Sequence, residues 1–279
     1  MKPLQPGLHV AATPIGNLAD ASPRLKTVLS QASRVLCEDT RVTGKLFAAL
    51  GIDRPPLTAY HEHNAERVRP AILEELENGA AMALVSDAGT PLISDPGYKL
   101  VRAVRDTGVH VFAVPGPSAL TAALSIGGAP TDQFTFVGFL PRGAGQKRRK
   151  LESLADRQET LVVYESGPRL AATLTSINEV FGPRRVSIAR ELTKMHEEVI
   201  EGDAAELTLR FDEKPPRGEI VLMVHPGDAA APDLDAVLAE LLERESLSSA
   251  ARQASTITGL PKKACYDRAL ALQKQEADS

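Results

Sequence analysis

The segment SDAGTPLISDPG, residues 86–97, concentrates residue types that bind ligands. It holds two Asp, two Ser and one Thr, and Gly89 and Gly97 allow positive φ or a close approach of the backbone. Pro91 and Pro96 stiffen the turn and remove two N–H donors. An ordinary loop before a helix is the alternative, but loops of this length are usually functional. The segment therefore predicts a ligand-binding loop.

Three further polar loops have the same character: ATPIGNLAD (12–20), CEDTR (37–41) and PGPSALTAA (115–123). In the last, backbone amides at a helix start can receive a polar group of a ligand. A simple turn with Ser118 as the N-cap is an equal alternative. The chain has neither GxGxxG nor GxxxxGK[ST], which disfavours dinucleotide binding and nucleotide hydrolysis. His61-Glu62-His63 is not HExxH and has no evident third ligand nearby, so no metal site is predicted.

One basic cluster, PRGAGQKRRK at 141–150, interrupts an acidic chain of net charge −4. Its cations are Arg142, Lys147, Arg148, Arg149 and Lys150. The cluster predicts a patch that contacts RNA phosphates, and a solvated loop or helix end is the equal alternative.

Composition excludes several classes of protein. The 279 residues are 43% hydrophobic and 24% charged, as in a folded globular protein. With 4% aromatic residues and no Trp, the chain is poorly supplied for stacking single-stranded bases. Two distant cysteines do not indicate a disulfide scaffold. The first ten residues lack the apolar core of a signal peptide, and prolines interrupt the charge-free stretch 107–131, so we expect a cytoplasmic protein without a membrane span.

Alternating strand and helix patterns must position these loops. Apolar runs that predict buried strands lie at 8–12, 33–38, 81–87 and 109–114, and helical patterns lie at 23–31, 41–50, 64–78 and 97–107. Such alternation predicts a parallel sheet covered by helices. Ligands bind outside the carboxyl ends of the strands in such sheets, and the polar loops fall there.

A second block follows Pro130, with strand patterns at 134–140, 160–166, 185–191 and 219–226 and helical patterns at 146–155 and 168–181. We interpret 199–211 as a strand followed by a helix, 226–232 as a linker, and the end of the chain as three helices that include a helix-turn-helix. The fold class is α/β. The predicted parts are an N-terminal domain (1–116), a second α/β domain (117–226) and a helical tail (233–275).

The strings VAATPIGNLAD, CEDTR, YHEHN, LVSDAGTPLISDPG and VPGPSALTAAL together resemble the tetrapyrrole-methylase superfamily. Within this superfamily, the chain is most similar to the family that methylates a cytidine ribose 2′-hydroxyl in the decoding region of bacterial small-subunit ribosomal RNA. The resemblance covers essentially the whole chain. It implies S-adenosylmethionine as the cofactor, a cofactor cleft between the two α/β domains, a homodimer, and the small subunit or its RNA as partner.

The resemblance also implies cofactor contacts by twelve residues, matched motif by motif: Pro14, Ala88, Gly89, Thr90, Ile93, Ser94, Ser118, Ala119, Tyr164, Glu165, Ala189 and Gly218. Methyl transfer from a sulfonium needs alignment rather than a metal, and a weakly acidic ribose hydroxyl benefits from a general base. Candidate bases are Asp39, His61, Glu165 and Glu191, and Arg41, Arg190 and Lys194 are candidates for stabilising the oxyanion or a phosphate. Nothing in the sequence chooses among them.

Two other functions compete with this interpretation. A methyltransferase acting on a small tetrapyrrole would share the cofactor site, but it would not need the basic cluster or the helical tail. A non-catalytic RNA-binding assembly factor would need the basic cluster, but it would not need the Gly- and Pro-rich loop 86–97.

Overall fold

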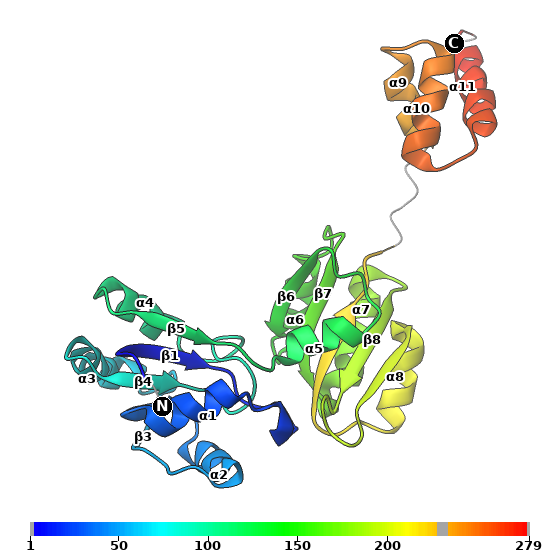
Figure 1. Cartoon of the computed structure of the whole chain (residues 1–279). Coiled ribbons are helices and arrows are strands. Elements are labelled where there is room, and N and C mark those ends of the chain that lie inside the picture. The colour runs from blue at the N-terminus through cyan, green and yellow to red at the C-terminus, as the bar shows by residue number, and fades with distance from the viewer. Residues whose placement is uncertain (1–2, 228–233, 278–279) are drawn as a thin grey trace. The chain divides into compact units, whose positions relative to one another are not determined.

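A computed structural model describes residues 3–227 and 234–277 of the chain. These residues form two compact units, Met1–His225 and Pro226–Ser279. Both predicted α/β domains fall within the first unit, each with its own sheet (Figure 1). Residues 228–232 of the predicted linker, and residue 233 at the start of the predicted tail, lie outside the described residues.

The first sheet is parallel throughout and has the order β3-β2-β4-β1-β5. Its strands are β1 Gly7–Ala11, β2 Arg34–Cys37, β3 Leu57–Ala59, β4 Ala81–Leu84 and β5 Val111–Val114. Four helices cover it: α1 Pro23–Gln31, α2 Thr40–Leu50, α3 Ala65–Glu77 and α4 Tyr98–Asp106. Along each strand, successive residues face α1 and α2 on one side of the sheet and α3 and α4 on the other. Residues on both sides are buried, which explains the continuous apolar runs.

Because all pairs are parallel, the loops after β1, β2, β4 and β5 leave the same edge of this sheet. These are the four loops that the sequence singled out. The sequence analysis missed β3, a three-residue edge strand with no fully buried side chain.

The second sheet has the order β6-β7-β10-β8-β9 and is antiparallel apart from the β6–β7 pair. Its strands are β6 Phe134–Phe139, β7 Thr160–Ser166, β8 Arg185–Arg190, β9 Glu198–Asp203 and β10 Glu219–Val224. Helices α6 Ala144–Glu152, α7 Leu170–Phe181 and α8 Ala204–Glu213 contribute to one core with this sheet. Helix α5 Ala119–Ile126 packs on Val162, Val221 and Met223, which belong to a separate core. Two 3₁₀ turns, Leu18–Asp20 and Gly167–Arg169, complete the unit.

Strand alternation in β7 decides which side chains can meet a ligand. Leu161 and Val163 belong to the core with α6, α7 and α8, whereas Val162 and Tyr164 belong to the core with α5. Glu165, one residue beyond Tyr164, therefore faces the α6–α8 side.

The second unit is a three-helix bundle of α9 Leu234–Leu242, α10 Leu247–Thr258 and α11 Lys262–Ala277. Its core is formed by Leu238, Ala251, Ala254, Cys265 and Ala269. Gly259, at φ 71°, ends α10 in the left-handed conformation that glycine adopts at low cost. In the described part of the chain, no helix combines the length and apolar character needed to span a bilayer.

Candidate functional site

Hydrogen bonds join the loops that leave the carboxyl edge of the first sheet. Thr13 and Gly89 exchange two backbone bonds, of 2.9 and 3.1 Å. The Thr90 hydroxyl donates to the Pro117 carbonyl at 3.0 Å. The Asp39 amide donates to an Asp87 carboxylate oxygen at 3.2 Å. These bonds hold the loops after β1, β2, β4 and β5 as one structure.

Strained backbone conformations occur in two loops. Among the described residues, the non-glycine residues with positive φ are Leu92, Ser94, Glu191 and Thr193. The first two lie in the loop 86–97, and the others lie in the loop between β8 and β9. Such conformations cost about 1–3 kcal/mol each and cluster at functional sites. Both loops contribute to the same cavity.

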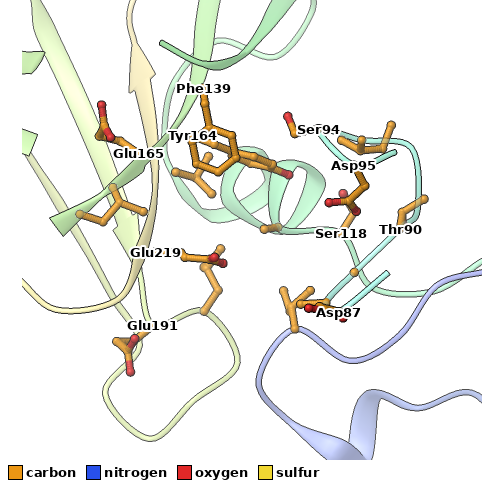
Figure 2. Close-up of a pocket in the computed structure, with 18 of the residues that line it drawn as sticks. Asp87, Thr90, Ser94, Asp95, Ser118, Phe139, Tyr164, Glu165, Glu191 and Glu219 are labelled. Atoms are coloured by element: carbon orange, nitrogen blue, oxygen red, sulfur yellow. The ribbon is translucent and has the colours of Figure 1, made fainter. Parts of the chain in front are cut away.

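That cavity has a volume of about 390 Å³ and lies between the loop 86–97 and the second sheet (Figure 2). Nine of the twelve residues predicted to contact a cofactor line it: Ala88, Gly89, Thr90, Ile93, Ser94, Ser118, Ala119, Tyr164 and Glu165. Glu191, a candidate base, also lines it. Lys194, a candidate for stabilising the oxyanion, lines it as well. The sequence analysis did not select the other lining residues: Ile15, Glu38, Asp87, Asp95, Phe139, Leu192, Glu219, Ile220 and Val221.

Three of the twelve residues do not line the cavity. Pro14 precedes Ile15, which does line it. Ala189 is fully buried in the core beneath α5. Gly218, at φ 88°, packs against Glu191, and a Cβ there would lie 2.5 Å from a Glu191 carboxylate oxygen. Gly218 therefore provides space for a lining residue and is not itself one.

Tyr164 connects the two halves of the site. Its hydroxyl accepts a hydrogen bond of 3.1 Å from the Leu120 amide in the first turn of α5. Its ring meets Phe136 and Phe139 edge-on, with ring centroids 4.9 and 5.6 Å apart. Burial raises the pKa of the Tyr164 phenol, so the group stays neutral near pH 7. Ser118 makes no side-chain capping bond to α5, and Tyr164 fills that role.

The cavity is rich in carboxylates. Glu38, Asp87, Asp95, Glu191 and Glu219 line it, with Lys194 as the lining cation. Burial, followed by repulsion from Glu38, raises the pKa of Asp95 to about 6. Burial and repulsion from neighbouring carboxylates also raise the pKa of Glu38 and Asp87. The cavity therefore favours a positively charged ligand.

Glu165 lines the cavity, but its carboxylate is directed away from it, which argues against its selection as a base. Its carboxylate is fully buried, accepts a hydrogen bond from the Thr173 hydroxyl at 2.7 Å and forms an ion pair with Arg169 Nε at 3.1 Å. Figure 2 shows this side chain directed away from Tyr164. Because neighbouring strand residues point to opposite faces, Tyr164 and Glu165 cannot both present side chains to one ligand.

The structure places Lys147 outside the predicted phosphate-binding patch. This lysine is buried on the inner face of α6, where its Nζ donates to the Thr173 hydroxyl at 3.0 Å. Burial lowers the pKa of the Lys147 ammonium, and Glu165 partly offsets that effect. The other predicted cations are exposed: Arg142, Arg148, Arg149 and Lys150. Arg148 is paired with Glu152 at 2.8 Å.

The remaining catalytic candidates are dispersed. Asp39 caps α2 and pairs with Arg41 at 2.6 Å, which lowers the pKa of Asp39 to about 2. Neither residue lines the cavity, and the Arg41 side chain is 86% exposed. His61 lines an adjoining hollow. Glu191 lines the cavity but pairs with Lys194 at 3.1 Å. Among the residues that the structure describes, no group of three His, Cys, Asp or Glu is arranged to hold a metal ion.

Two protein-family models match the chain and identify the class to which it belongs. Residues 7–208 match the Tetrapyrrole (Corrin/Porphyrin) Methylases, and residues 228–273 match the RsmI C-terminal HTH domain. The chain therefore belongs to the tetrapyrrole methylase family. It is 47% identical over 270 residues to the Ribosomal RNA small subunit methyltransferase I of Xylella fastidiosa strain Temecula1, covering 93% of this chain and 97% of the relative. The protein of the same name from Mesorhizobium japonicum is 45% identical, with 98% and 94% covered.

Solved structures share the fold at low sequence identity. Diphthine synthase superposes with a TM-score of 0.58 at 14% identity, covering 78% of this chain and 89% of that one. A uroporphyrin-III C-methyltransferase from Thermus thermophilus, complexed with S-adenosyl homocysteine, gives a TM-score of 0.54 at 18% identity, covering 78% and 97%. Both are similar to this chain in fold.

Proposed function

We propose that this chain is an S-adenosylmethionine-dependent methyltransferase of small-subunit ribosomal RNA, and that it methylates a cytidine 2′-hydroxyl in the decoding region. Relatives named Ribosomal RNA small subunit methyltransferase I match it over nearly their whole length. The structural observation that carries the proposal is the single cavity lined by nine of the twelve expected cofactor contacts.

The cavity fits the cofactor chemically. S-adenosylmethionine carries a sulfonium and an ammonium group, and the carboxylates of Asp87, Asp95 and Glu219 complement positive charge. Ile15 and Ile93 supply apolar walls suited to an adenosine, as expected of a small-molecule site with a few polar groups. When bound, the cofactor supplies an electrophilic methyl group. A Cβ at Gly89 would lie 3.1 Å from Ile15, so a side chain there would crowd this wall.

The chain's own residues orient the reactants and exclude water. The bonds between Thr13, Gly89, Thr90 and Pro117 hold the loops in place before a ligand arrives. Positioned groups of this kind contribute most to a displacement that needs only alignment and proton removal. The partly buried ring of Tyr164, which packs edge-on against Phe136, makes one wall less polar, and this strengthens the electrostatic interactions there.

RNA binding is proposed for the exposed cations of the basic cluster that remain after the correction of Lys147. Arg142, Arg149 and Lys150 are exposed, and Lys262 and Lys263 begin the last helix of the tail. Phosphate contacts by these groups would give sequence-independent, salt-dependent affinity. Arg268 of the tail pairs with Asp235 at 2.6 Å and is not assigned to RNA. A homodimer and a cytoplasmic location are part of the same proposal.

The test measures cofactor binding first and methyl transfer second. Calorimetry should detect S-adenosylmethionine binding to the purified protein, weakened at least tenfold by Asp87→Leu in the cavity and unchanged by Glu152→Gln on the surface. Label from the cofactor should then reach undermethylated small subunits and not uroporphyrinogen. Label on the tetrapyrrole alone would replace the proposed substrate, and the absence of cofactor binding would leave an RNA-binding factor.

A further inference from the structure

A second cavity, of about 490 Å³, borders the cofactor cavity on the side of the second sheet. It is lined by Arg190, Glu191, His196, Glu197, Glu198 and Arg217, and we call it the arginine hollow. Glu191 also lines the cofactor cavity, so the two spaces share a boundary. Figure 2 shows Glu191 below Glu219, on the second-sheet side of the cofactor cavity. None of the twelve residues that the resemblance assigned to the cofactor lines the arginine hollow.

The carboxylates of the arginine hollow are already engaged by the chain itself. Glu191 pairs with Lys194 at 3.1 Å, and Glu198 pairs with Arg190. Glu197 accepts a hydrogen bond of 2.6 Å from a backbone amide of the β8–β9 loop. Each negative charge of this space is therefore balanced, at least in part, by donors of the chain.

The cations of the arginine hollow are not matched in the same way. Arg217 and His196 are exposed, and neither side chain has a hydrogen bond or an ion pair in the part of the chain that the structure describes. Arg190 contacts Glu198 through Nη1, but its Nε is buried and has no hydrogen-bond partner among the described residues. A buried donor without a partner costs stability. The arginine hollow therefore offers positive charge and unused donors to an anion.

The backbone that carries Arg217 is held in place on both sides. The amide of Gly167, directly after β7, donates to the Gly218 carbonyl at 3.1 Å. A Cβ at Gly167 would lie 1.7 Å from the Pro216 carbonyl oxygen, so these two segments touch. Because both neighbours of Arg217 are fixed, its guanidinium has a defined starting position at the arginine hollow.

The other hollow beside the cofactor cavity has the opposite character. Glu38, Glu62 and Asp95 line it together with His61 and His63, and no lysine or arginine of the described chain lines it. Carboxylates repel a phosphate, and the repulsion is strong where water is partly excluded. Of the two hollows beside the cofactor cavity, the arginine hollow is therefore the one that suits an anion.

The chemistry of RNA gives an anion site at this position a purpose. The 2′-hydroxyl and the 3′-phosphate of a nucleotide stand on neighbouring ribose carbons, so a bound phosphate fixes the hydroxyl beside it. Arginine binds phosphate oxygens through a planar set of donors, and such contacts position a nucleic acid without reading its sequence. A phosphate in the arginine hollow would bring the adjoining ribose to the boundary at Glu191, where the cofactor cavity begins.

We propose that the arginine hollow binds the RNA backbone phosphate that flanks the acceptor ribose, with Arg217 and Arg190 as the main donors and His196 as a third contact. This inference rests on the proposed function. The three residues hold and orient the substrate, and they exchange neither a proton nor a methyl group with it. The carboxylate of S-adenosylmethionine is an anion that the same donors would accept, and cofactor-binding measurements distinguish the two sources.

Arg217→Gln tests the arginine hollow. In filter binding to undermethylated small subunits, the slope of affinity against salt should fall by about 1, as expected for one lost phosphate contact. Affinity should fall by about tenfold, near the lower end for a hydrogen bond to a charged group, since Arg217 is exposed. Arg217→Lys keeps the charge and should restore the slope.

Arg105→Gln is the matched control for the loss of one exposed positive charge. Arg105 lies in the last turn of α4, which leads from the loop 86–97 back to the start of the parallel strand β5. It is therefore at the edge of the first sheet opposite the cofactor loops. This variant should keep the wild-type slope, affinity and rate.

The rate at saturation distinguishes a phosphate beside the acceptor from a phosphate elsewhere. With saturating subunits, single-turnover transfer by Arg217→Gln should be slowed by about tenfold, because a displaced acceptor loses its alignment with the methyl group. Arg190→Lys keeps a cation beside Glu198 but removes the Nε donor, and its rate should fall in the same direction. Replacing Arg149 and Lys150 by Gln on the surface of α6 should lower affinity alone.

The outcomes separate this inference from the proposed function. If wild-type protein binds the cofactor but methylates no RNA, the proposed function fails and the inference fails with it. If wild-type protein methylates subunits while Arg217→Gln keeps the wild-type slope and rate, only the inference fails. Lower affinity with an unchanged rate at saturation would place the phosphate away from the acceptor and overturn it. Calorimetric affinity for S-adenosylmethionine should equal that of wild type, and a clear loss would assign the hollow to the cofactor carboxylate and also overturn the inference.

Discussion

Glu165→Gln should destabilise the Met1–His225 unit more than it affects proton transfer. The carboxylate is completely buried, accepts hydrogen bonds from the Ser166 amide at 2.8 Å and from Thr173 at 2.7 Å, and forms an ion pair with Arg169 at 3.1 Å. Thr173 in turn accepts from the buried Lys147 ammonium at 3.0 Å. The substitution keeps the shape of the side chain and removes the negative charge that lies near the buried Lys147 and the partly exposed Arg169.

The size of the loss follows from these contacts. Removing one partner of a buried ion pair typically costs about 3–5 kcal/mol, because the remaining charge is left without compensation. The Arg169 side chain is 27% exposed and still donates to the Leu140 carbonyl at 2.6 Å. Lys147 keeps its hydrogen bond to Thr173, but it is buried and has no comparable access to solvent. We therefore expect the lower end, about 3 kcal/mol, and a fall in Tm of about 6–12 °C for a unit of this size.

Urea unfolding followed by far-UV circular dichroism measures the loss, with single-turnover transfer measured in parallel. Glu152→Gln is the matched control, since its ion pair with Arg148 is exposed and should contribute under about 1 kcal/mol. Lys147→Met in the Glu165→Gln background should recover part of the stability. An unchanged free energy of unfolding together with a hundredfold slower transfer would refute this reasoning and make Glu165 a candidate base again.

Three further predictions use other parts of the unit. Replacing Arg149 and Lys150 by Gln should lower the salt slope of RNA affinity by about 1–2, measured by filter binding, and an unchanged slope would remove this patch from the interface. Gly167→Ala places a Cβ 1.7 Å from the Pro216 carbonyl oxygen and should lower the calorimetric Tm, whereas an equal Tm would contradict this packing. Asp95 has a pKa raised from 3.8 to about 6, so the folded state binds more protons than the unfolded state in that window and loses stability as pH rises through it. Asp95→Asn should therefore raise the urea midpoint at pH 7 but not at pH 4, and an equal gain at both pH values would contradict this.

The positions of the loops could be predicted because they follow from sheet geometry. Parallel strands place their carboxyl ends at one edge, so the polar segments 12–20, 37–41, 86–97 and 115–123 had to gather there. The family resemblance added which residues of these loops to select. The short strand β3 was missed because three half-buried residues carry no periodic pattern.

Side-chain direction was the main source of error. Glu165 was selected beside Tyr164 although strand alternation places the two on opposite faces, a signal already present in the sequence. Lys147 was grouped with its charged neighbours, yet it lies four residues before the buried Leu151 on the same side of α6. Asp95 was overlooked inside a loop that had been singled out, because only the folded loop brings it near Glu38 and Glu219.

The position of the transferred methyl group tests the account most directly. Purified protein would be incubated with labelled S-adenosylmethionine and undermethylated small subunits, and the RNA would be digested with nuclease and analysed by mass spectrometry. The account predicts label in 2′-O-methylcytidine from a single site in the decoding region. Label on a nucleobase, or no label on RNA from a protein that binds the cofactor, would contradict it.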